Sequence, residues 1–378
     1  MKITVPTIDF GTSKIVTMVA QSNGERCDIV GSGAVPYSGY LQDGWNNPDE
    51  IRDVIRTAID QAQKTGNCRI HELNVGVPGM FTRVIVKEVH VSLTGPDPHV
   101  TAQDVRACFK LAEESGGDRI IHSAPAWFRV DDGKKTLSPV GIKGRELSAM
   151  IALVTADKYF IDDITYRLRD MDIEPREFYS TVAGEATYAL SQDERDKTAM
   201  LIDIGYLCTD VMVMEGDALI FHKCLDIGGG HISADIAEQL NIPFPFVEEK
   251  IKQTYSFNST NQDETYVIPA TEDEPARTVR RDEVTPIIEA KVEEIAEAIN
   301  KALEEGGVKL GKWSNVYLTG GGLILNKGGK DFLAGKLHRI IREAQRTNNK
   351  MTSHVFSSAV GLTILVVTTQ EEQKAPEG

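Results

Sequence analysis

The stretch Ile8-Asp9-Phe10-Gly11-Thr12-Ser13-Lys14 recurs in outline later in the chain as Ile202-Asp203-Ile204-Gly205, followed by Tyr206-Leu207-Cys208-Thr209-Asp210. In both copies an apolar run reaches an aspartate and then a glycine-containing turn, and a β-branched or methionine-rich run follows. A short turn and another strand-like run complete each copy. Each copy is thus a strand, an acidic turn, a strand, a hairpin turn and a strand. This duplication predicts two similar half-molecules that clamp one nucleotide between them.

Composition narrows the class of protein. A length of 378 residues suggests two or three domains. The hydrophobic fraction of 41% and the charged fraction of 26% are those of an ordinary globular protein. A net charge of −15 argues against binding to nucleic acid, which needs clustered Lys and Arg. The five cysteines form no C-x-x-C pair, which favours reduced thiols in a cytoplasm over a zinc or disulfide framework.

Periodicity and turn residues predict the remaining elements. No signal segment leads the chain, and no apolar run reaches the roughly 20 residues of a membrane-spanning helix. The polar, aperiodic residues 256–263 predict a mobile loop, 360–367 a buried element and 370–378 a disordered tail. The other predicted elements are helices at 47–64, 157–170 and 283–305, helices after Thr101-Ala102-Gln103-Asp104 and after 228–230, strands at 73–79, 83–93, 119–122 and 147–155, a turn at 131–134 and a strand meander over 200–226.

The two acidic turns carry the chemistry of a phosphate and metal site. Asp9 and Asp203 each stand at a strand end, where a carboxylate can hold Mg²⁺ directly or through water. The backbone N–H groups and hydroxyls of Gly11, Thr12 and Ser13, with Lys14 adding charge, suit phosphate oxygens. Gly205 and Thr209 repeat that arrangement. Either turn alone is more simply an ordinary hairpin, but two in one chain favour function.

Two glycine-rich turns are further candidates. Gly228-Gly229-Gly230 precedes a helix, so its N–H groups can approach an anion, although a flexible strand-to-helix joint explains it equally well. His231, which follows, is expected to be a capping or surface residue. Gly320-Gly321-Gly322 ends a strand and permits close approach to a flat ligand such as a nucleobase and its ribose. No Walker-type loop occurs, which disfavours a P-loop mechanism.

Glu249 and Lys252 lie one helical turn apart. Their side chains have the reach and polarity to contact a ribose or a base edge. A solvated surface ion pair is the more usual outcome of this spacing. Both interpretations stay open at this point.

With these motifs placed, the chain resembles the actin, sugar-kinase and heat-shock ATPase superfamily, and within it the FtsA family of bacterial actin homologues. The resemblance runs from Thr7 to about Leu365. It implies an α/β fold, namely the actin-like ATPase fold with two duplicated mixed-sheet halves and an FtsA-type inserted subdomain. The segments that carry it outside the acidic turns are 31–39, Asp43-Gly44, 74–79, 101–105, 139–144, 193–195, 228–232, 249–252 and 358–362.

The resemblance also implies domain boundaries. The first half would comprise 1–80, 155–198 and 355–369, with the inserted subdomain at 81–154. The second half would comprise 199–240 and 306–354, with a smaller subdomain at 241–305 and the tail at 370–378.

By resemblance, ATP and Mg²⁺ are the expected cofactors. Asp9, Gly11, Thr12, Ser13 and Lys14 would form the first phosphate motif, and Asp203, Gly205 and Thr209 the second. Glu249 and Lys252 would contact the adenosine, Gly320 to Gly322 would lie beneath it, and Gly228 and Gly229 would complete the set. The family implies self-association into filaments, recruitment of an FtsZ-like protein through its C-terminal peptide or of other division proteins, and tethering to the inner membrane.

The chain departs from the family pattern in two places. Tyr206-Leu207-Cys208 replace small residues, and because Tyr and Leu resist positive φ, weak ATPase activity at most is expected. The tail after Thr369 lacks the family's basic amphipathic helix. We therefore expect a cytoplasmic protein without direct lipid binding, which reaches the inner face of the membrane through partners.

Two alternatives stay open from the sequence. One is a pilus-assembly adaptor of the PilM kind, and the other is a metabolite kinase on the same fold. The catalytic base cannot be assigned. Glu185 lies in the connection between the halves, where a surface role is expected.

Overall fold

The computed structural model describes residues 3–41, 44–117, 119–261, 263–270, 275–311, 314–344 and 353–374. Contacts divide the chain into two compact units. The first takes in Met1–Leu201, Met212–Lys223 and Gln345–Gly378, and the second takes in Ile202–Val211 and Cys224–Ala344. The finer domain division inferred from the sequence stays a prediction.

The first unit is built on a five-stranded mixed sheet. Its order is β10-β6-β1-β2-β3, with β2 antiparallel to both of its neighbours, β1 and β3, and β6 parallel to both β1 and β10. The strands are β1 (Ile3–Phe10), β2 (Lys14–Ser22), β3 (Cys27–Pro36), β6 (Glu72–Val77) and β10 (Glu174–Ser180).

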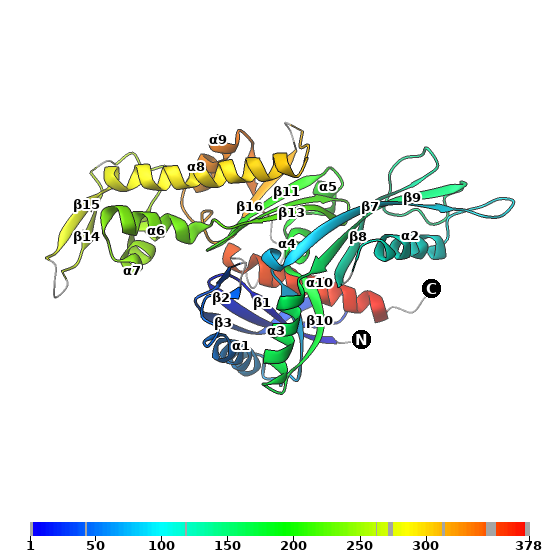
Figure 1. Cartoon of the computed structure of the whole chain (residues 1–378), viewed down its shortest axis with the longest axis horizontal. Helices are drawn as coiled ribbons and strands as arrows, with labels where there is room; N and C mark the ends of the chain where they lie inside the picture. Colours follow the sequence, from blue (N-terminus) through cyan, green and yellow to red (C-terminus); the bar gives the residue numbers. More distant parts are fainter. Residues whose placement is uncertain are drawn as a thin grey trace. The chain divides into compact units, whose positions relative to one another are not determined.

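Helices cover both faces of this sheet. Side chains alternate along a strand, so Ile8 and Phe10 of β1 join the core under α1 (Ile51–Gly66), while Ile3 and Val5 join the core under α10 (Ser357–Lys374). Both faces of β1 are therefore apolar, and Asp9 lies near its carboxyl end. Figure 1 shows β1 beside β2 and β10. The unit also contains β4 (Tyr40–Leu41), β5 (Gly44–Trp45), η1 (Gly79–Phe81), α3 (Lys158–Arg169), α4 (Thr181–Ala189), α5 (Gln192–Arg195) and η3 (His354–Phe356).

The inserted segment forms its own three-stranded sheet, in the order β7-β9-β8, with one helix. The helix is capped as predicted, because Asp104 N–H donates to Thr101 Oγ1 and Thr101 N–H donates to Asp104 Oδ2. The strand predicted at 119–122 is too short, since β8 continues through Pro125 to Val130. The register shifts after Pro125, which accommodates a proline inside the strand. A proline in this position is a poor signal for a continuous strand, so the sequence indicated only its first part. The bounds are β7 (Thr82–Ser92), α2 (Ala102–Glu114), β8 (Ile120–Val130) and β9 (Glu146–Ala156).

A second five-stranded sheet repeats the topology of the first. Its order is β13-β12-β11-β16-β17, so a three-strand meander again lies beside two later strands. A helix follows each meander, α1 in the first case and α6 in the second. The duplication inferred from the acidic turns is therefore confirmed at the level of strand order. The bounds are β11 (Ala199–Ile204), β12 (Thr209–Glu215), β13 (Ala218–Leu225), β16 (Asn315–Thr319) and β17 (Ile341–Glu343).

The elements outside this sheet between residues 229 and 337 are mostly helical. Helix α8 packs along α6, as Figure 1 shows. The predicted helix at 283–305 is confirmed, beginning two residues earlier. The elements are α6 (Gly229–Leu240), α7 (Phe244–Phe246), η2 (Val247–Lys252), β14 (Thr265–Ile268), β15 (Arg277–Arg280), α8 (Arg281–Glu305) and α9 (Gly329–Leu337).

Two boundaries differ from expectation. Helix α1 begins at Ile51 rather than Asn47, because 48–50 form a turn. The tail predicted from Gln370 is wrong in its first part, since α10 runs to Lys374 and Gln370 is buried, donating from Nε2 to Asn74 Oδ1 over 3.3 Å. Residues 375–378 and Asp43 lie outside the described part. The mobility expected for 256–263 stays a prediction. Among the described helices, none is both long and apolar enough to span a membrane.

Candidate functional site

Asp9 is a buried carboxylate held by hydroxyl groups. It is 4% exposed, and Ser358 Oγ donates to its Oδ2 over 2.7 Å while Thr181 Oγ1 donates to its Oδ1 over 3.4 Å. Burial raises the pKa of Asp9, and the hydrogen bond from Ser358 and the charge of Lys14 act against that rise. A nearby cation would stabilise this carboxylate further.

The turn after Asp9 is closed by one backbone hydrogen bond. Gly11 N–H donates to the Lys14 carbonyl over 3.1 Å, and Tyr37 OH donates to the Gly11 carbonyl over 2.7 Å. Lys14 Nζ lies 5.4 Å from the centre of the Phe356 ring, a direction that the sequence could not give. Thr12 is buried and Ser13 is half-buried. The turn is therefore rigidly anchored in the first unit.

The second turn has the same closure. Gly205 N–H donates to the Cys208 carbonyl over 2.9 Å, as Gly11 does to Lys14. None of Gly205, Tyr206, Leu207 and Cys208, all within the described residues, has a left-handed backbone. The expectation that Tyr206 and Leu207 would disturb the loop by resisting positive φ is therefore wrong in its premise. This loop accepts bulky residues without backbone strain.

The glycines at 228–230 hold the second turn. Gly229 N–H donates to the Gly205 carbonyl over 2.8 Å, and Gly230 N–H donates to the Tyr206 carbonyl over 2.7 Å. Gly228 N–H donates to His231 Nδ1 over 3.0 Å, which confirms His231 as a capping residue. These amides, predicted to approach an anion, are instead engaged within the chain. Thr209 Oγ1 likewise donates to the Ile227 carbonyl over 2.7 Å.

The glycines at 320–322 pack against the same turn. Gly322 N–H donates to the Ile204 carbonyl over 2.7 Å. A Cβ on Gly322 would lie 2.4 Å from the Gly205 carbonyl oxygen, and one on Gly229 would lie 2.4 Å from Gly322 Cα. The absence of side chains therefore serves close approach of three backbone segments. Contact of Gly320–Gly322 with a nucleobase stays a prediction.

Lys252 reaches the second turn, whereas Glu249 stays exposed. Both residues lie in a π-helix, η2, and Lys252 Nζ pairs with Glu248 at 3.3 Å. Lys252 is 7% exposed, and burial lowers its pKa from 10.5, opposed by the charge of Glu248. Its ammonium lies 5.8 Å from the centre of the Tyr206 ring. The surface pair considered for Glu249 and Lys252 is thus replaced by a buried contact to the phosphate turn.

Two partners of Asp9 and the burial of Glu185 escaped the sequence reasoning. Thr181 and Ser358 lie far from Asp9 in sequence, and only the packing of α4 and α10 brings them to it. Glu185, expected at the surface, is 1% exposed. Gly184 and Gly361 explain this, since a Cβ on Gly361 would lie 2.5 Å from Glu185 Cα. The backbones of α4 and α10 meet here and enclose the carboxylate.

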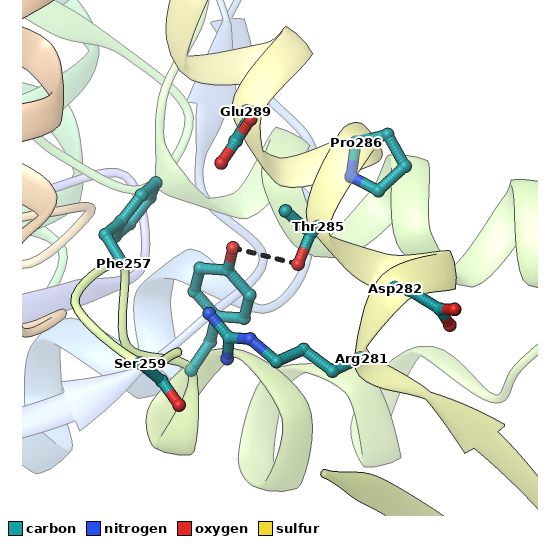
Figure 2. Close-up of a pocket in the computed structure, with 8 residues that line it drawn as sticks. Phe257, Ser259, Arg281, Asp282, Thr285, Pro286 and Glu289 are labelled. Carbon is teal, nitrogen blue, oxygen red and sulfur yellow. Dashed lines mark hydrogen bonds between the residues drawn. The ribbon is translucent and has the colours of Figure 1, made fainter. Parts of the chain in front are cut away.

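The second unit also has a pocket away from these turns. It has a volume of about 340 Å³, and Figure 2 shows Arg281 and Phe257 on its wall. The Arg281 guanidinium lies 4.3 Å from the centre of the Tyr255 ring, donates to the Ser256 carbonyl over 2.6 Å and pairs with Glu264 at 3.1 Å. None of the predicted nucleotide-site residues lines this pocket.

Two sheets of matching topology, each bearing an Asp–Gly turn with the same closing hydrogen bond, define an actin-like ATPase fold. Solved structures agree on the fold. The PilM–PilN type IV pilus biogenesis complex aligns with a TM-score of 0.63 at 17% identity over 97% of this chain and 99% of that chain. MreB 5 of Spiroplasma citri bound to AMPPNP aligns with a TM-score of 0.59 at 11% identity over 98% of each chain.

Sequence comparisons find similarity to one family. The model of cell division protein FtsA matches residues 200–361, and that of the SHS2 domain inserted in FtsA matches residues 79–155. Cell division protein FtsA of Pseudomonas aeruginosa is 26% identical over 83% of this chain and 76% of its own length. That of Bacillus subtilis is 26% identical over 80% of this chain and 70% of its own length. The chain is an FtsA-like, actin-like cell-division protein, and these matches favour FtsA over the PilM-like alternative.

Proposed function

We propose that this chain binds Mg·ATP through both Asp–Gly turns and, in that state, assembles with itself and with division proteins. One observation carries the nucleotide proposal. In each turn an aspartate stands two residues before a glycine whose N–H closes the turn onto the carbonyl three residues later. Two copies of a rigid turn beside a carboxylate suit two ends of one metal-bound polyphosphate.

The donor set fits Mg²⁺. Carboxylate oxygens are hard ligands, and Asp9 and Asp203 would hold the ion directly or through its water shell. For Asp9, burial among hydroxyl donors leaves a carboxylate that gains from a cation. The ion would neutralise phosphate charge, while the turns and Lys14 orient the phosphate oxygens. Lys252, beside Tyr206, is the residue placed to sense the occupant of the second turn.

The partners follow from the relatives. Proteins named for cell division cover most of this chain at about one quarter identity, which supports self-association and recruitment of division proteins. An FtsZ-like C-terminal peptide is the partner we propose, with location at the inner face of the membrane reached through partners. Fluorescence anisotropy of such a peptide, with and without nucleotide, measures this step.

Asp9→Asn and Asp203→Asn are each expected to weaken Mg·ATP binding about tenfold or more, equivalent to ~1.4 kcal/mol. The substitution keeps the size and most hydrogen bonds of the side chain but removes the charge that holds the metal. Isothermal calorimetry with Mg·ATP measures the change. Asp53→Asn, on the exposed face of α1, is the control and should bind as the parent does. Equal affinities in the parent and both site variants would refute the nucleotide proposal.

The Asp9→Asn variant can also be tested through the stability of the folded state, which should rise while nucleotide affinity falls. The pKa of Asp9 is raised on folding, so burial of its charge destabilises the folded state above that pKa, and the cost disappears as pH falls through it. Asparagine removes the charge at every pH. Without nucleotide, Asp9→Asn is therefore expected to raise the urea midpoint at neutral pH. Weaker binding with higher stability separates loss of a metal ligand from misfolding.

Hydrolysis is expected to be slow without partners. Phosphoryl transfer depends on positioned charge and a positioned water, and bulky Tyr206 and Leu207 occupy the loop where the family carries small residues. Release of phosphate, followed with Mg·ATP in excess, is expected to stay near the background rate. Replacing both residues by glycine should raise the rate if their bulk is the cause. Many turnovers per minute by the unmodified chain would contradict this expectation.

A further inference from the structure

Three donor side chains meet at the base of the second phosphate turn. Cys208 lies at the end of that turn, Asp210 follows it on β12, and Cys224 lies on the neighbouring strand β13. One ligand atom from each, the two Sγ atoms and a carboxylate oxygen, lies within 4.8 Å of the others. Both cysteines are half-buried thiols. The hairpin, rather than any short sequence spacing, brings them together.

We propose that Cys208, Asp210 and Cys224 form a binding site for a thiophilic divalent cation such as Zn²⁺. Two sulfurs and one carboxylate oxygen make a set that favours zinc over magnesium or calcium, which prefer oxygen ligands alone. Two thiolates on one tetrahedral zinc lie about 3.8 Å apart. The three donor atoms therefore need only small side-chain rotations to surround an ion, and water completes the fourth position.

Proton binding and metal binding compete at these thiols. The hydrogen bond with Cys208, burial and the charge of Asp210 raise the pKa of Cys224 well above its ordinary value. Negative charge on these donors is thus costly unless a cation accompanies it. On binding, each thiol loses its proton to the buffer as a metal–sulfur bond forms, and neither sulfur changes oxidation state.

The proposed metal site is directly connected to the second Asp–Gly turn. The Cys208 carbonyl is the group that accepts the closing hydrogen bond of the turn, and Cys208 Sγ lies 4.0 Å from the place of a Cβ on Gly205. An ion bound to Cys208 and Cys224 would tie that turn to β13. Cysteine spacing disfavoured zinc, and the proposal departs from that expectation because a turn and the neighbouring strand bring the two thiols together.

Metal binding is tested on the full reduced chain without nucleotide, so its outcome does not depend on ATP binding. Titration with Co²⁺ is expected to give one ion per chain and a thiolate-to-cobalt charge-transfer band, and Zn²⁺ should remove that band. Cys224→Ser should abolish the band and weaken Zn²⁺ binding about 100-fold or more, beyond the usual effect of losing a residue that only orients a ligand. Cys68→Ser, a half-buried thiol of the first unit, is the control and should behave as the parent.

Two further variants keep the test decisive. Asp210→Asn should retain the charge-transfer band with weaker affinity, because the two sulfurs remain. Cys208→Ala replaces Cys224→Ser if circular dichroism shows the latter to be unfolded. Absence of a charge-transfer band in the parent, or an equal band in the folded cysteine variant, would overturn the proposal.

Discussion

Replacing Gly361 with alanine is expected to lower the free energy of unfolding by about 2–3 kcal/mol. A Cβ at this position would lie 2.5 Å from Glu185 Cα and 2.7 Å from the Gly184 carbonyl oxygen. Both are backbone atoms, so no side-chain rotation relieves the contact, and α4 and α10 have to separate. The separation also moves Ser358, which donates to Asp9, and should therefore weaken nucleotide binding.

Urea denaturation of the parent and of Gly361→Ala measures the loss. The matched control is Gly335→Ala in α9, where an added Cβ meets nothing within 4 Å. Both changes improve helix propensity, by ~1 kcal/mol. The control should therefore gain stability while Gly361→Ala loses it. A gain in both variants would show that α4 and α10 do not pack through these glycines.

Gly320→Ala is expected to destabilise the second unit by about 3 kcal/mol or more and to abolish nucleotide binding. Gly320 has a φ of +89°, which is unfavourable for alanine. A Cβ there would also lie 2.0 Å from Asp203 Oδ1 and 2.4 Å from the Ile204 carbonyl oxygen. The substitution thus strains the backbone and displaces the carboxylate proposed to hold the metal.

Gly307→Ala separates these two costs. Gly307 has a φ of +63°, but an added Cβ there meets nothing within 4 Å. The free energy of unfolding of Gly307→Ala should fall only by the cost of placing alanine in a left-handed backbone, ~1–2 kcal/mol. Denaturation midpoints and calorimetry with Mg·ATP on both variants give the comparison. Similar losses in the two variants would mean that the tight packing of Gly320 against Asp203 contributes little.

The sequence predicted those elements whose signals are local. Alternating residues and hairpin turns marked both meanders, and Thr101 with Asp104 marked the start of α2. The two Asp–Gly turns were found because each is contiguous in sequence. Their matching backbone closure then appeared in the structure without having been used to find them.

What escaped prediction depends on contacts between distant segments. Glu185 looked like a surface residue because its burial is created by Gly361, far along the chain. Strand β10 was missed because Glu174-Pro175-Arg176 shows no alternation of apolar and polar residues. Its pairing with β6, a contact between distant segments, stabilises the strand instead. Lys252 pairs with Glu248 and not with Glu249, and helical spacing alone does not distinguish these two partners.

The error at Tyr206 has a different cause. The resemblance suggested a loop with positive φ because the family carries small residues at these positions. In this chain, the described residues of the loop adopt ordinary backbone angles, and the glycines at 228–230 and 322 provide the space instead. A glycine in a family pattern can therefore reflect a neighbouring backbone rather than its own torsion angles.

Helix α10, the last helix described, covers one face of the sheet that begins with β1. Thr363 shares a hydrogen bond of 2.7 Å with Thr7, and Leu362 and Val366 fill the core beside Val5. At about 5–20 residues per second, translation reaches α10 roughly 20–70 s after β1 is made. Until then that face of β1 lacks its cover. The first unit therefore cannot complete its fold until α10 has been synthesised.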